Sequence, residues 1–379
     1  MRLGLEFEYG SSMTALVRRG SRVPVKPEVS ILILVLERVE LLLRCLDSLA
    51  AVEGPRHEII VVGNGTPPDA LAQLSDRSDL VVVPVPVNLG FAGGCNWGAR
   101  FARGRSIVLL NDDTEVEPGW ISALADVAAS DGRIGTVGSR LLDFDGRILE
   151  AGGIVWSDGS THRVGRGLPA ASRAYDEVRD VDYSSACGLL VTRSAWDAVG
   201  GLDEAYFPAY HEDVDLCFSL RSWGFRTVYC PIARLRHHEG VGSGMPYMGF
   251  AARRNGRYFS AKWAGELAGH EPPPVEDVAE TVARAVADAA RRHLPPTRAA
   301  PAAGRPDPTE FEFVQAQNRA LVAAVQLNDA YIAQLNDENT YLRTEHEKLE
   351  RVRTAVRRVP LGGWLARRAA RRSTHRRAD

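Results

Sequence analysis

The sequence is poor in cysteine and lacks a long apolar segment, and each shortage excludes a class of protein. Its five cysteines are odd in number and form no CxxC pair, so we expect reduced thiols in a cytoplasmic protein, not a disulfide framework or a zinc site. The main apolar run, residues 29–36, is too short to span a bilayer. Residues 1–27 contain no apolar signal-peptide core, and we expect them to form an unstructured leader.

The usual phosphate-binding loops are missing as well. The chain has no GxxxxGK[ST] motif, and Gly90-Phe91-Ala92-Gly93-Gly94 does not make a GxGxxG pattern. The first predicted strand is followed by Glu37-Arg38, where a dinucleotide-binding fold would have glycines. These absences argue against a Rossmann dehydrogenase. If the protein handles phosphate groups, it needs a cation to do so.

The formal net charge of -2 conceals a strongly basic tail over residues 359–379. Its apolar residues Leu361, Trp364 and Leu365 stand beside pairs of arginines, a combination that fits the anionic inner face of a cell membrane. A disordered, solvated tail explains the composition equally well. Nucleic acid is the weakest alternative, because no interleaved aromatic residues or DNA-binding motif accompany the arginines.

Short apolar runs alternate with segments of helical period between residues 28 and 270. Strands are predicted over residues 29–36, 58–62, 80–83, 106–111, 134–142, 187–191 and 227–230, and helices over 41–49, 69–74, 91–101, 118–127, 196–199, 213–223 and 258–263. This alternation indicates an α/β domain whose mainly parallel sheet carries helices on both faces.

A second region follows the α/β domain. Residues 271–309 read as a short helix and a Pro/Ala-rich linker, and residues 310–358 as a coiled coil. The seam positions recur every seven residues, at Leu321, Asn328, Leu335, Leu342, Leu349 and Val356, and again four residues later at Val325, Ile332, Asn339 and His346. The pattern predicts a homodimer, and the alternative is a lone helix packed on the α/β domain.

Three clusters of acids or imidazoles stand at the ends of predicted elements. The first, Asn111-Asp112-Asp113, ends a buried strand, although such residues also form ordinary turns. The others are residues 210–215, at the start of a helix, and His237-His238-Glu239-Gly240, after a strand. The carboxyl edge of the sheet would bring them together. Carboxylate and imidazole donors suit Mn²⁺ or Mg²⁺ with positions left for substrate phosphates.

In their order, these clusters and the surrounding motifs resemble the family 2 (GT-A fold) inverting glycosyltransferases. The resemblance is closest to those of bacterial polysaccharide and O-antigen assembly, including rhamnosyltransferase-like members. The matching motifs are Asn88-Leu89-Gly90-Phe91, Leu109-Leu110-Asn111-Asp112-Asp113-Thr114, Glu117-Pro118-Gly119-Trp120, Glu150-Ala151-Gly152-Gly153, Ala186-Cys187-Gly188-Leu189-Leu190-Val191, Gly200-Gly201-Leu202-Asp203-Glu204, Glu212-Asp213-Val214-Asp215-Leu216 and His237-His238-Glu239-Gly240. Each motif is weak alone, whereas their order is specific.

The resemblance implies roles for individual residues. Asp113 matches the metal-binding acid, and His237, or its neighbour His238, matches the histidine that completes the metal site. Asp213 matches the general base that takes the proton of the acceptor hydroxyl. The substrate-binding residues implied in the same way are Asn64, Asn88, Gly90, Asn111, Asp112 and Glu212.

The implied reaction moves a sugar from a nucleotide-sugar donor to a hydroxyl of a glycan or lipid-linked acceptor, with inversion, in cell-surface polysaccharide assembly. The sequence departs from the family at two places. Leu34-Val35-Leu36-Glu37-Arg38 replaces a Pro-x-Tyr-Asn-like segment, and Gly63 stands where an acid normally grips the nucleotide base. These departures motivate the alternative of a non-catalytic scaffold that acts through its coiled coil.

Overall fold

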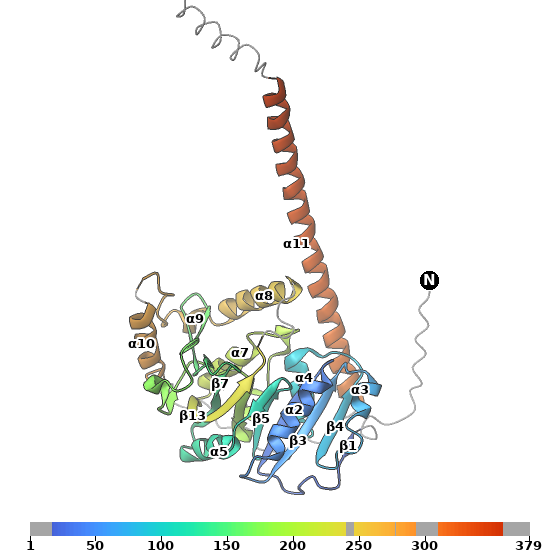
Figure 1. The fold of residues 1–379 in the computed structure, drawn as a ribbon, viewed down its shortest axis with the longest axis vertical. Helices are drawn as coiled ribbons and strands as arrows, with labels where there is room; N and C mark the ends of the chain where they lie inside the picture. Colours follow the sequence, from blue (N-terminus) through green and yellow to red (C-terminus); the bar gives the residue numbers. More distant parts are fainter. Residues whose placement is uncertain (1–16, 240–245, 277, 293–309, 359–379) are drawn as a thin grey trace, which may run out of the picture. The chain divides into compact units, whose positions relative to one another are not determined.

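The computed structural model describes residues 17–239, 246–276, 278–292 and 310–358. The chain divides into two compact units, residues 1–324 and 325–379. The first unit contains an α/β domain built on a large mixed sheet (Figure 1). The basic tail, the first sixteen residues of the expected leader and most of the Pro/Ala-rich linker lie outside the described residues.

The order of the strands in the sheet is β1-β4-β3-β2-β5-β12-β7-β13-β11, with β6 paired to β13 and β8 paired to β7. The strands are β1 (Arg18–Arg19), β2 (Val29–Val35), β3 (His57–Asn64), β4 (Leu80–Val85), β5 (Ser106–Asn111), β6 (Thr114–Val116), β7 (Ile134–Leu142), β8 (Ile148–Glu150), β11 (Arg179–Asp180), β12 (Gly188–Thr192) and β13 (Arg226–His237); β9 (Gly153–Val155) and β10 (Thr161–Arg163) form a separate pair.

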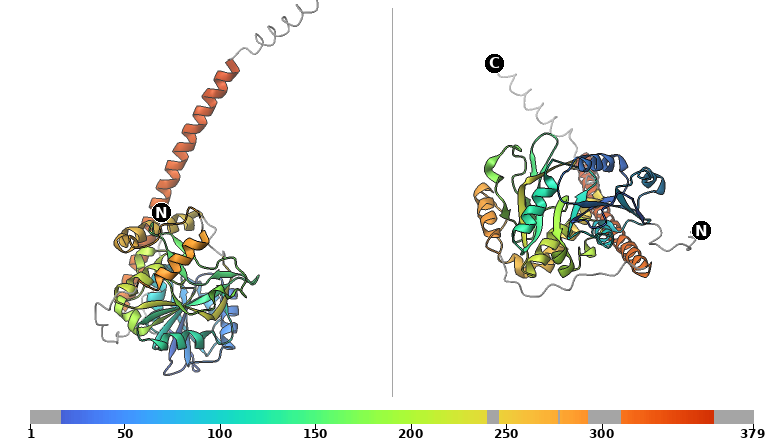
Figure 2. Two further views of the ribbon diagram at one scale, coloured as in Figure 1. Left: turned by 90° about the vertical axis from the view of Figure 1, so that its left-hand side faces the viewer. Right: turned by 90° about the horizontal axis from the view of Figure 1, so that it is seen from below.

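Helices cover both faces of the sheet, as the sequence predicts. The helices are α2 (Val39–Ala50), α3 (Pro68–Ala72), α4 (Gly90–Ala99), α5 (Trp120–Ser130), α6 (Arg193–Val199), α7 (Glu212–Ser222), α8 (Pro246–Lys262), α9 (Ala264–Leu267), α10 (Val278–Ala289) and α11 (Glu310–Arg358), with the short 3-10 helices η1 (Arg173–Tyr175) and η2 (Glu204–Tyr206). Helices flank the sheet on both sides (Figure 2). Buried side chains of α2 and α5 belong to the core on one face, and those of α4, α6 and α7 to the core on the other.

The strands β2, β3, β4 and β5 are parallel and form the half of the sheet that the sequence describes best. Their side chains are buried on both faces, because each strand lies between two layers of helices. Alternate residues of β2 enter different cores, with Ile31 and Ile33 against α2, and Leu32 against α4. These strands all point their carboxyl ends to one edge, which is where the acid cluster after β5 lies.

The other half of the sheet is antiparallel in part, because β12 runs opposite to both of its neighbours, β5 and β7. The strand expected over residues 227–230 is longer in the structure. It continues through an irregularity between Cys230 and Arg234 to His237, and pairs with β7 and then with β6. Period-two patterns are interrupted at such an irregularity, which is why the sequence indicated a short strand followed by a lead-out.

The prediction that residues 1–27 are unstructured is wrong for the last part of this segment. Residues 18–19 form β1, which pairs with β4 at the edge of the sheet. Arg19 donates to Glu58 at 2.6 Å, and the Glu58 carboxylate, fully buried, also accepts from Ser30 Oγ and from the amide of Arg103, each at 2.7 Å. A buried carboxylate needs such partners, so this segment belongs to the folded domain.

Removing this arginine should destabilise the domain. We expect Arg19→Ala to lower the free energy of unfolding by about 2 kcal/mol, because Glu58 keeps its two neutral donors and loses its charged one. Urea denaturation measures the change. Arg22→Ala is the matched control, since the Arg22 side chain is 72% exposed, and it should stay within about 0.5 kcal/mol. Equal stability of both variants would contradict the prediction.

The segment after residue 271, expected to lie outside the domain, also packs against it. Val282 and Ala285 of α10 are buried with Ile154, Trp156 and Val164. Beyond α10, Arg292 forms an ion pair with the fully buried Asp182 at 2.6 Å. The proline run at 272–274 is therefore not the end of the folded core.

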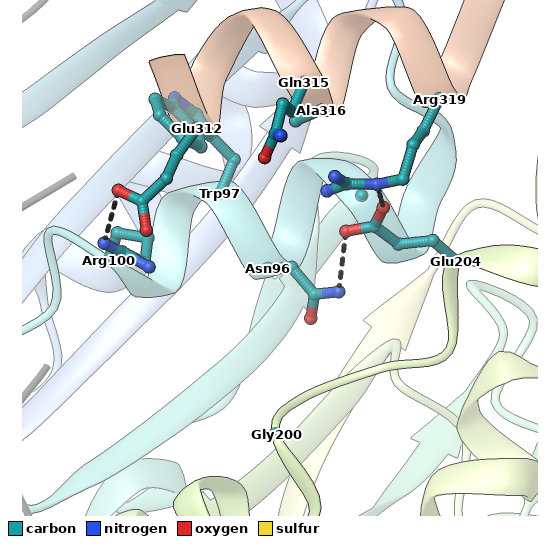
Figure 3. A pocket seen from close by; sticks show the side chains of 10 residues that line it. Asn96, Trp97, Arg100, Gly200, Glu204, Glu312, Gln315, Ala316 and Arg319 are labelled. Carbon is teal, nitrogen blue, oxygen red and sulfur yellow. Dashed lines mark hydrogen bonds and ion pairs between the residues drawn. The ribbon is translucent and has the colours of Figure 1, made fainter. Parts of the chain in front are cut away.

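The first turns of α11 belong to the same unit as the α/β domain. They are held beside α4 and η2 by two ion pairs, Arg100 with Glu312 at 3.0 Å and Arg319 with Glu204 at 2.9 Å (Figure 3). The pocket between these elements has a volume of about 240 Å³. It contains none of the acids expected to carry chemistry, so we assign it no role in the candidate site. Within the described residues, no helix combines the length and apolar content that a membrane crossing requires.

Candidate functional site

The site is built around Asp113, two residues after the end of β5. The pairing of β6 with β13 places His237 opposite Thr114 and so beside Asp113. The distance from His237 Nε2 to Asp113 Oδ1 is 3.1 Å, and the amide of His238 donates to the Asp113 carbonyl at 3.0 Å. An acid and a histidine more than a hundred residues apart thus meet at the carboxyl edge of the sheet, as the sequence predicts.

The neighbouring His238 points elsewhere. Its ring stacks on Phe144 with a centroid distance of 3.9 Å, and its Nε2 lies 3.9 Å from a Glu115 carboxylate oxygen. His238 follows the last residue of β13, and its ring lies on Phe144, away from Asp113. The structure therefore selects His237 over its neighbour as the imidazole of this site.

The donor set fits a divalent cation that also binds substrate. Asp113 Oδ1 is buried and makes no well-aligned hydrogen bond. Burial and the charge of Asp113 together raise the pKa of Asp112 to about 7. A cation would relieve the repulsion between the two carboxylates. No group of three His, Cys, Asp or Glu side chains in the described parts of the chain is arranged around one point. Asp113 and His237 suit an ion whose remaining ligands are substrate phosphates and water.

The first turn of α7 carries three acids, and they have different surroundings. Asp215 is buried and fully engaged, accepting from Tyr206 Oη at 2.9 Å, Trp263 Nε1 at 2.7 Å and Lys262 Nζ at 2.9 Å. Glu212 is also buried, near Cys95, and burial together with the charge of Asp213 raises its pKa well above the ordinary range. Asp213 is therefore the accessible acid of the three. Glu212 was expected to contact substrate, but its side chain faces the protein interior.

Asp213 is oriented by two backbone amides. Its carboxylate accepts from the amide of Ala186 at 3.2 Å and from that of Val214 at 2.8 Å. The helix begins after Tyr210 and His211, whose φ angles of 82° and 73° lie in the left-handed region that non-glycine residues rarely adopt. Such backbone strain is found where the surrounding structure fixes the position of a functional residue.

The segment 185–187 connects the clusters. The Ser185 amide donates to Glu150 at 2.9 Å, and the Ala186 amide donates to Asp213. The Cys187 thiol lies close to the His237 ring, and the Cys187 carbonyl accepts from the Asn111 amide at 3.4 Å. One short turn before β12 thus links the Asp113–His237 pair to the candidate base. In sequence this segment is featureless apart from its place in a family motif.

Glu150, at the end of β8, is a site residue to which sequence reasoning assigned no role. Its side chain is buried and its Oε2 has no hydrogen bond, although the Arg163 guanidinium lies 3.8 Å away. Burial raises the pKa of Glu150 to about 7, despite the opposing effects of Arg163 and the Ser185 amide. The only sequence signal was its place in the Glu-Ala-Gly-Gly motif.

The raised pKa of Glu150 has a consequence for stability. The protonated carboxyl is favoured in the folded state, so its contribution is present below the unfolded pKa of about 4.5 and is lost as pH rises to about 7. The free energy of unfolding of Glu150→Gln, taken relative to that of the original protein, should be up to about 3 kcal/mol higher at pH 8 than at pH 4.5. Denaturation at both pH values measures this. Glu40→Gln, at an exposed position of α2, should show no such pH dependence, and a flat difference for Glu150→Gln would contradict the assignment.

The expected contact of Asn64 with the nucleotide is not supported by its surroundings. Its Oδ1 accepts from the Leu89 amide at 2.8 Å, and its Nδ2 donates to Asn88 Oδ1 at 3.2 Å and to the Gly90 carbonyl at 3.0 Å. Asn64 therefore positions the loop that leads into α4. Gly90 has a φ of 73°, and a side chain there would collide with Phe207. Glycine is therefore required at position 90 for a steric reason. Asn88 is exposed at its tip.

Gly63 lies at the end of β3, directly before Asn64. A Cβ atom at Gly63 would lie 2.5 Å from Cδ1 of Leu71, the far end of a flexible side chain on α3. The space that an acid would need is thus filled by a leucine from the following helix. The missing carboxylate is therefore accompanied by a local change in packing.

Parts of the chain are similar to known proteins. Residues 30–167 match the model of the family described as Glycosyl transferase family 2. The chain is 32% identical over 233 residues to the O-antigen biosynthesis protein RfbC of Myxococcus xanthus, covering 58% of this chain and 18% of that protein. It is 35% identical over 164 residues to an N-acetylglucosaminyl-diphospho-decaprenol L-rhamnosyltransferase of Mycobacterium tuberculosis, covering 40% of this chain and 53% of that enzyme. The matches thus span only part of these relatives.

Among solved structures, the fold is similar to that of GalNAc-T7, crystallised with UDP, GalNAc and Mn²⁺. The TM-score is 0.51 at 16% sequence identity, over 70% of this chain and 55% of that one. The likeness concerns the fold. Together with the family match over residues 30–167, it confirms the predicted fold class and resemblance: these residues match glycosyl transferase family 2, and the α/β domain has the GT-A fold.

Proposed function

We propose that the protein is an inverting glycosyltransferase that moves a sugar from a nucleotide-sugar donor to an acceptor hydroxyl. The observation that carries this proposal is the placement of the Asp113–His237 pair and Asp213 on the two sides of the segment 185–187. A cation-binding pair and an accessible carboxylate, fixed by one turn, are what a single displacement on a sugar diphosphate needs.

In this proposal the first half of the site binds the donor. Asp113 and His237 would hold Mn²⁺ or Mg²⁺, which would supply positive charge against the diphosphate leaving group. The structural neighbour GalNAc-T7, whose crystals contained UDP and Mn²⁺, supports the choice of a divalent ion with a nucleotide diphosphate. Asn111 and Asp112, on the same turn, face the nucleotide sugar. The loop at Asn88 and Gly90 contacts its nucleotide part.

Asp213 is the base. Its carboxylate takes the proton of the acceptor hydroxyl as the oxygen attacks the anomeric carbon, because a neutral hydroxyl is a poor nucleophile. The amides of Ala186 and Val214 keep the carboxylate in place during this step. The base acts on the face of the sugar opposite to the leaving diphosphate, so the configuration at the anomeric carbon is inverted.

The acceptor that we propose is a glycan or a lipid-linked sugar in cell-surface polysaccharide assembly. The relatives support this, one being named for O-antigen biosynthesis and the other for transfer of rhamnose to N-acetylglucosaminyl-diphospho-decaprenol. Such an acceptor would place the protein in the cytoplasm, at the inner face of the membrane, where the basic tail could contact anionic lipid.

A screen of nucleotide sugars tests the activity. The purified chain is incubated with each donor and Mn²⁺ or Mg²⁺, and nucleotide release is measured with and without EDTA. Release that depends on the metal with at least one donor supports the proposal. If no nucleotide is released, calorimetry with the same panel measures whether any donor binds. If no donor binds in the presence of Mn²⁺, the scaffold alternative motivated by Gly63 is favoured.

We also propose that α11 forms a two-stranded coiled coil with a second copy of the chain. The described seam positions Val325, Ile332, Leu335, Leu342 and Leu349 are between 44% and 66% exposed in the single chain, and burying them requires a partner. Ile332→Asp with Leu335→Asp should halve the mass measured by light scattering. Ala330→Asp with Ala333→Asp, at outward positions of the heptad, is the control. An unchanged mass in the seam variant would refute the dimer.

A further inference from the structure

A hollow of about 760 Å³ lies beside the start of α7 and has no role in the steps described above. One wall is the loop over residues 158–161, and another is a face of α8 that carries Arg253, Gly256, Arg257 and Ser260. These α8 residues recur at intervals of three, four or one, so they lie on a single side of the helix. His211 closes the hollow towards α7.

The hollow is preformed by close contacts between its walls. Ser260 Oγ donates to the Asp158 carbonyl at 2.9 Å, and a side chain on Gly159 would begin 2.1 Å from that hydroxyl. On α8, a Cβ atom at Gly256 would lie 3.3 Å from the ring of His211. Glycine at both positions lets the loop, α8 and the start of α7 approach one another. The space between them is therefore part of the fold.

The hollow is close to the candidate base. His211 precedes Asp213 by two residues, so their Cα atoms are at most about 7 Å apart. The His211 ring is close enough to Asp213 to sense the charge of its carboxylate, so one wall of the hollow adjoins the candidate base. The residues that line the hollow include neither Asp113 nor His237, the pair assigned to the donor.

The charges of the hollow are not balanced. Arg253 and Arg257 are exposed and, in the part of the chain that the structure describes, have no hydrogen bond or ion pair. Arg254 differs, since it donates to the carbonyls of Ala205 and Phe207. The one carboxylate in the lining, Asp158, is engaged by the amide and hydroxyl of Ser160. Two guanidinium groups four residues apart on a helix repel each other, and an anion between them removes this cost.

We propose that this hollow binds the phosphate or diphosphate group of the acceptor through Arg253 and Arg257, while the hydroxyl of the acceptor's sugar lies at Asp213. Guanidinium groups bind phosphate through paired N–H donors, which suits a specificity site for glycosyl phosphates. The inference rests on the proposed function. It adds a second anion site, separate from the one that binds the donor's diphosphate.

A binding experiment tests the hollow without catalysis. Inorganic pyrophosphate is titrated into the full chain in EDTA, so that no metal-bound site competes, and heat is measured by calorimetry. We expect Arg253→Gln with Arg257→Gln to weaken pyrophosphate binding by about tenfold or more. Arg44→Gln, an exposed arginine on α2 that does not line the hollow, should bind as the original protein does. No binding to the original protein, or equal binding to the double variant, overturns the inference.

A transfer experiment distinguishes an acceptor site from a site for free phosphate. Two synthetic acceptors are compared, an N-acetylglucosaminyl diphosphate with a short alkyl chain and the neutral alkyl N-acetylglucosaminide. The ratio of their kcat/KM values should fall about tenfold in the double variant, through KM of the diphosphate acceptor. An equal fall for both acceptors overturns the inference. If the original protein uses neither acceptor, the proposed function is weakened, and the pyrophosphate titration alone decides on the hollow.

Discussion

An Asp213→Asn variant should lose about 10²- to 10⁴-fold in kcat for sugar transfer, because general-base catalysis contributes a factor of that size. Asn has nearly the same shape but cannot take a proton from the acceptor hydroxyl. Its single amide oxygen can keep one of the two bonds that Asp213 accepts from Ala186 and Val214. The loss of the other should cost about 1 kcal/mol of stability, far too little to unfold the domain.

The separation between chemistry and binding makes this prediction specific. Donor affinity with Mn²⁺ should stay within about threefold of the original value, since the carboxylate acts on the acceptor. Asp126→Asn, at an exposed position of α5, is the control and should leave kcat unchanged. Asp215→Asn should instead lower stability, because Asp215 is buried and accepts three hydrogen bonds. A kcat for Asp213→Asn close to the original would exclude Asp213 as the base.

The sequence predicts the parallel half of the sheet well, because the signals there are local. The apolar runs that became β2 and β5 have few polar residues, and helical periods separate them. A strand buried on both faces must have this composition, so its position can be recognised without knowing its neighbours. The carboxyl end of β5 follows directly, and with it the place of Asp113.

The second half of the site depends on pairings that no local pattern specifies. His237 reaches Asp113 only because β13 passes an irregularity after Cys230 and then pairs with β6. Glu150 enters the site because β8 pairs with β7, and the amide of Ser185 then meets its carboxylate. Both contacts join residues far apart in the chain. A family motif can indicate such residues, but only the tertiary structure shows that His237 and not His238 faces the acid.

The roles of Asn64 and Glu212 show a different limit. Both are polar residues at the sheet edge or at a helix start, which is where ligands bind in open α/β folds. In the structure, Asn64 holds the loop at Asn88, and the Glu212 carboxyl is buried. Polar residues near a site often support its shape rather than contact the ligand, and composition alone cannot separate these roles.

An Asp113→Asn variant should lose the effect of Mn²⁺ on donor binding, because a neutral amide is a weaker ligand than a carboxylate. In the original protein, EDTA should weaken nucleotide-sugar binding strongly. In the variant, affinity with Mn²⁺ should be at least about 10-fold lower and nearly the same as in EDTA. Transfer should fall by about 10²-fold or more, since the charge on the departing diphosphate is then left unstabilised.

The adjacent histidines supply the sharpest control for the proposed metal site. His237→Ala should behave as Asp113→Asn does, because His237 Nε2 lies 3.1 Å from Asp113 Oδ1. His238→Ala should retain the gain in affinity on adding Mn²⁺, because the His238 ring stacks on Phe144 instead. The two neighbours thus differ in what their rings contact, Asp113 for His237 and Phe144 for His238. If His238→Ala lost the Mn²⁺ effect while His237→Ala kept it, the pairing of β6 with β13 could not be the basis of the metal site.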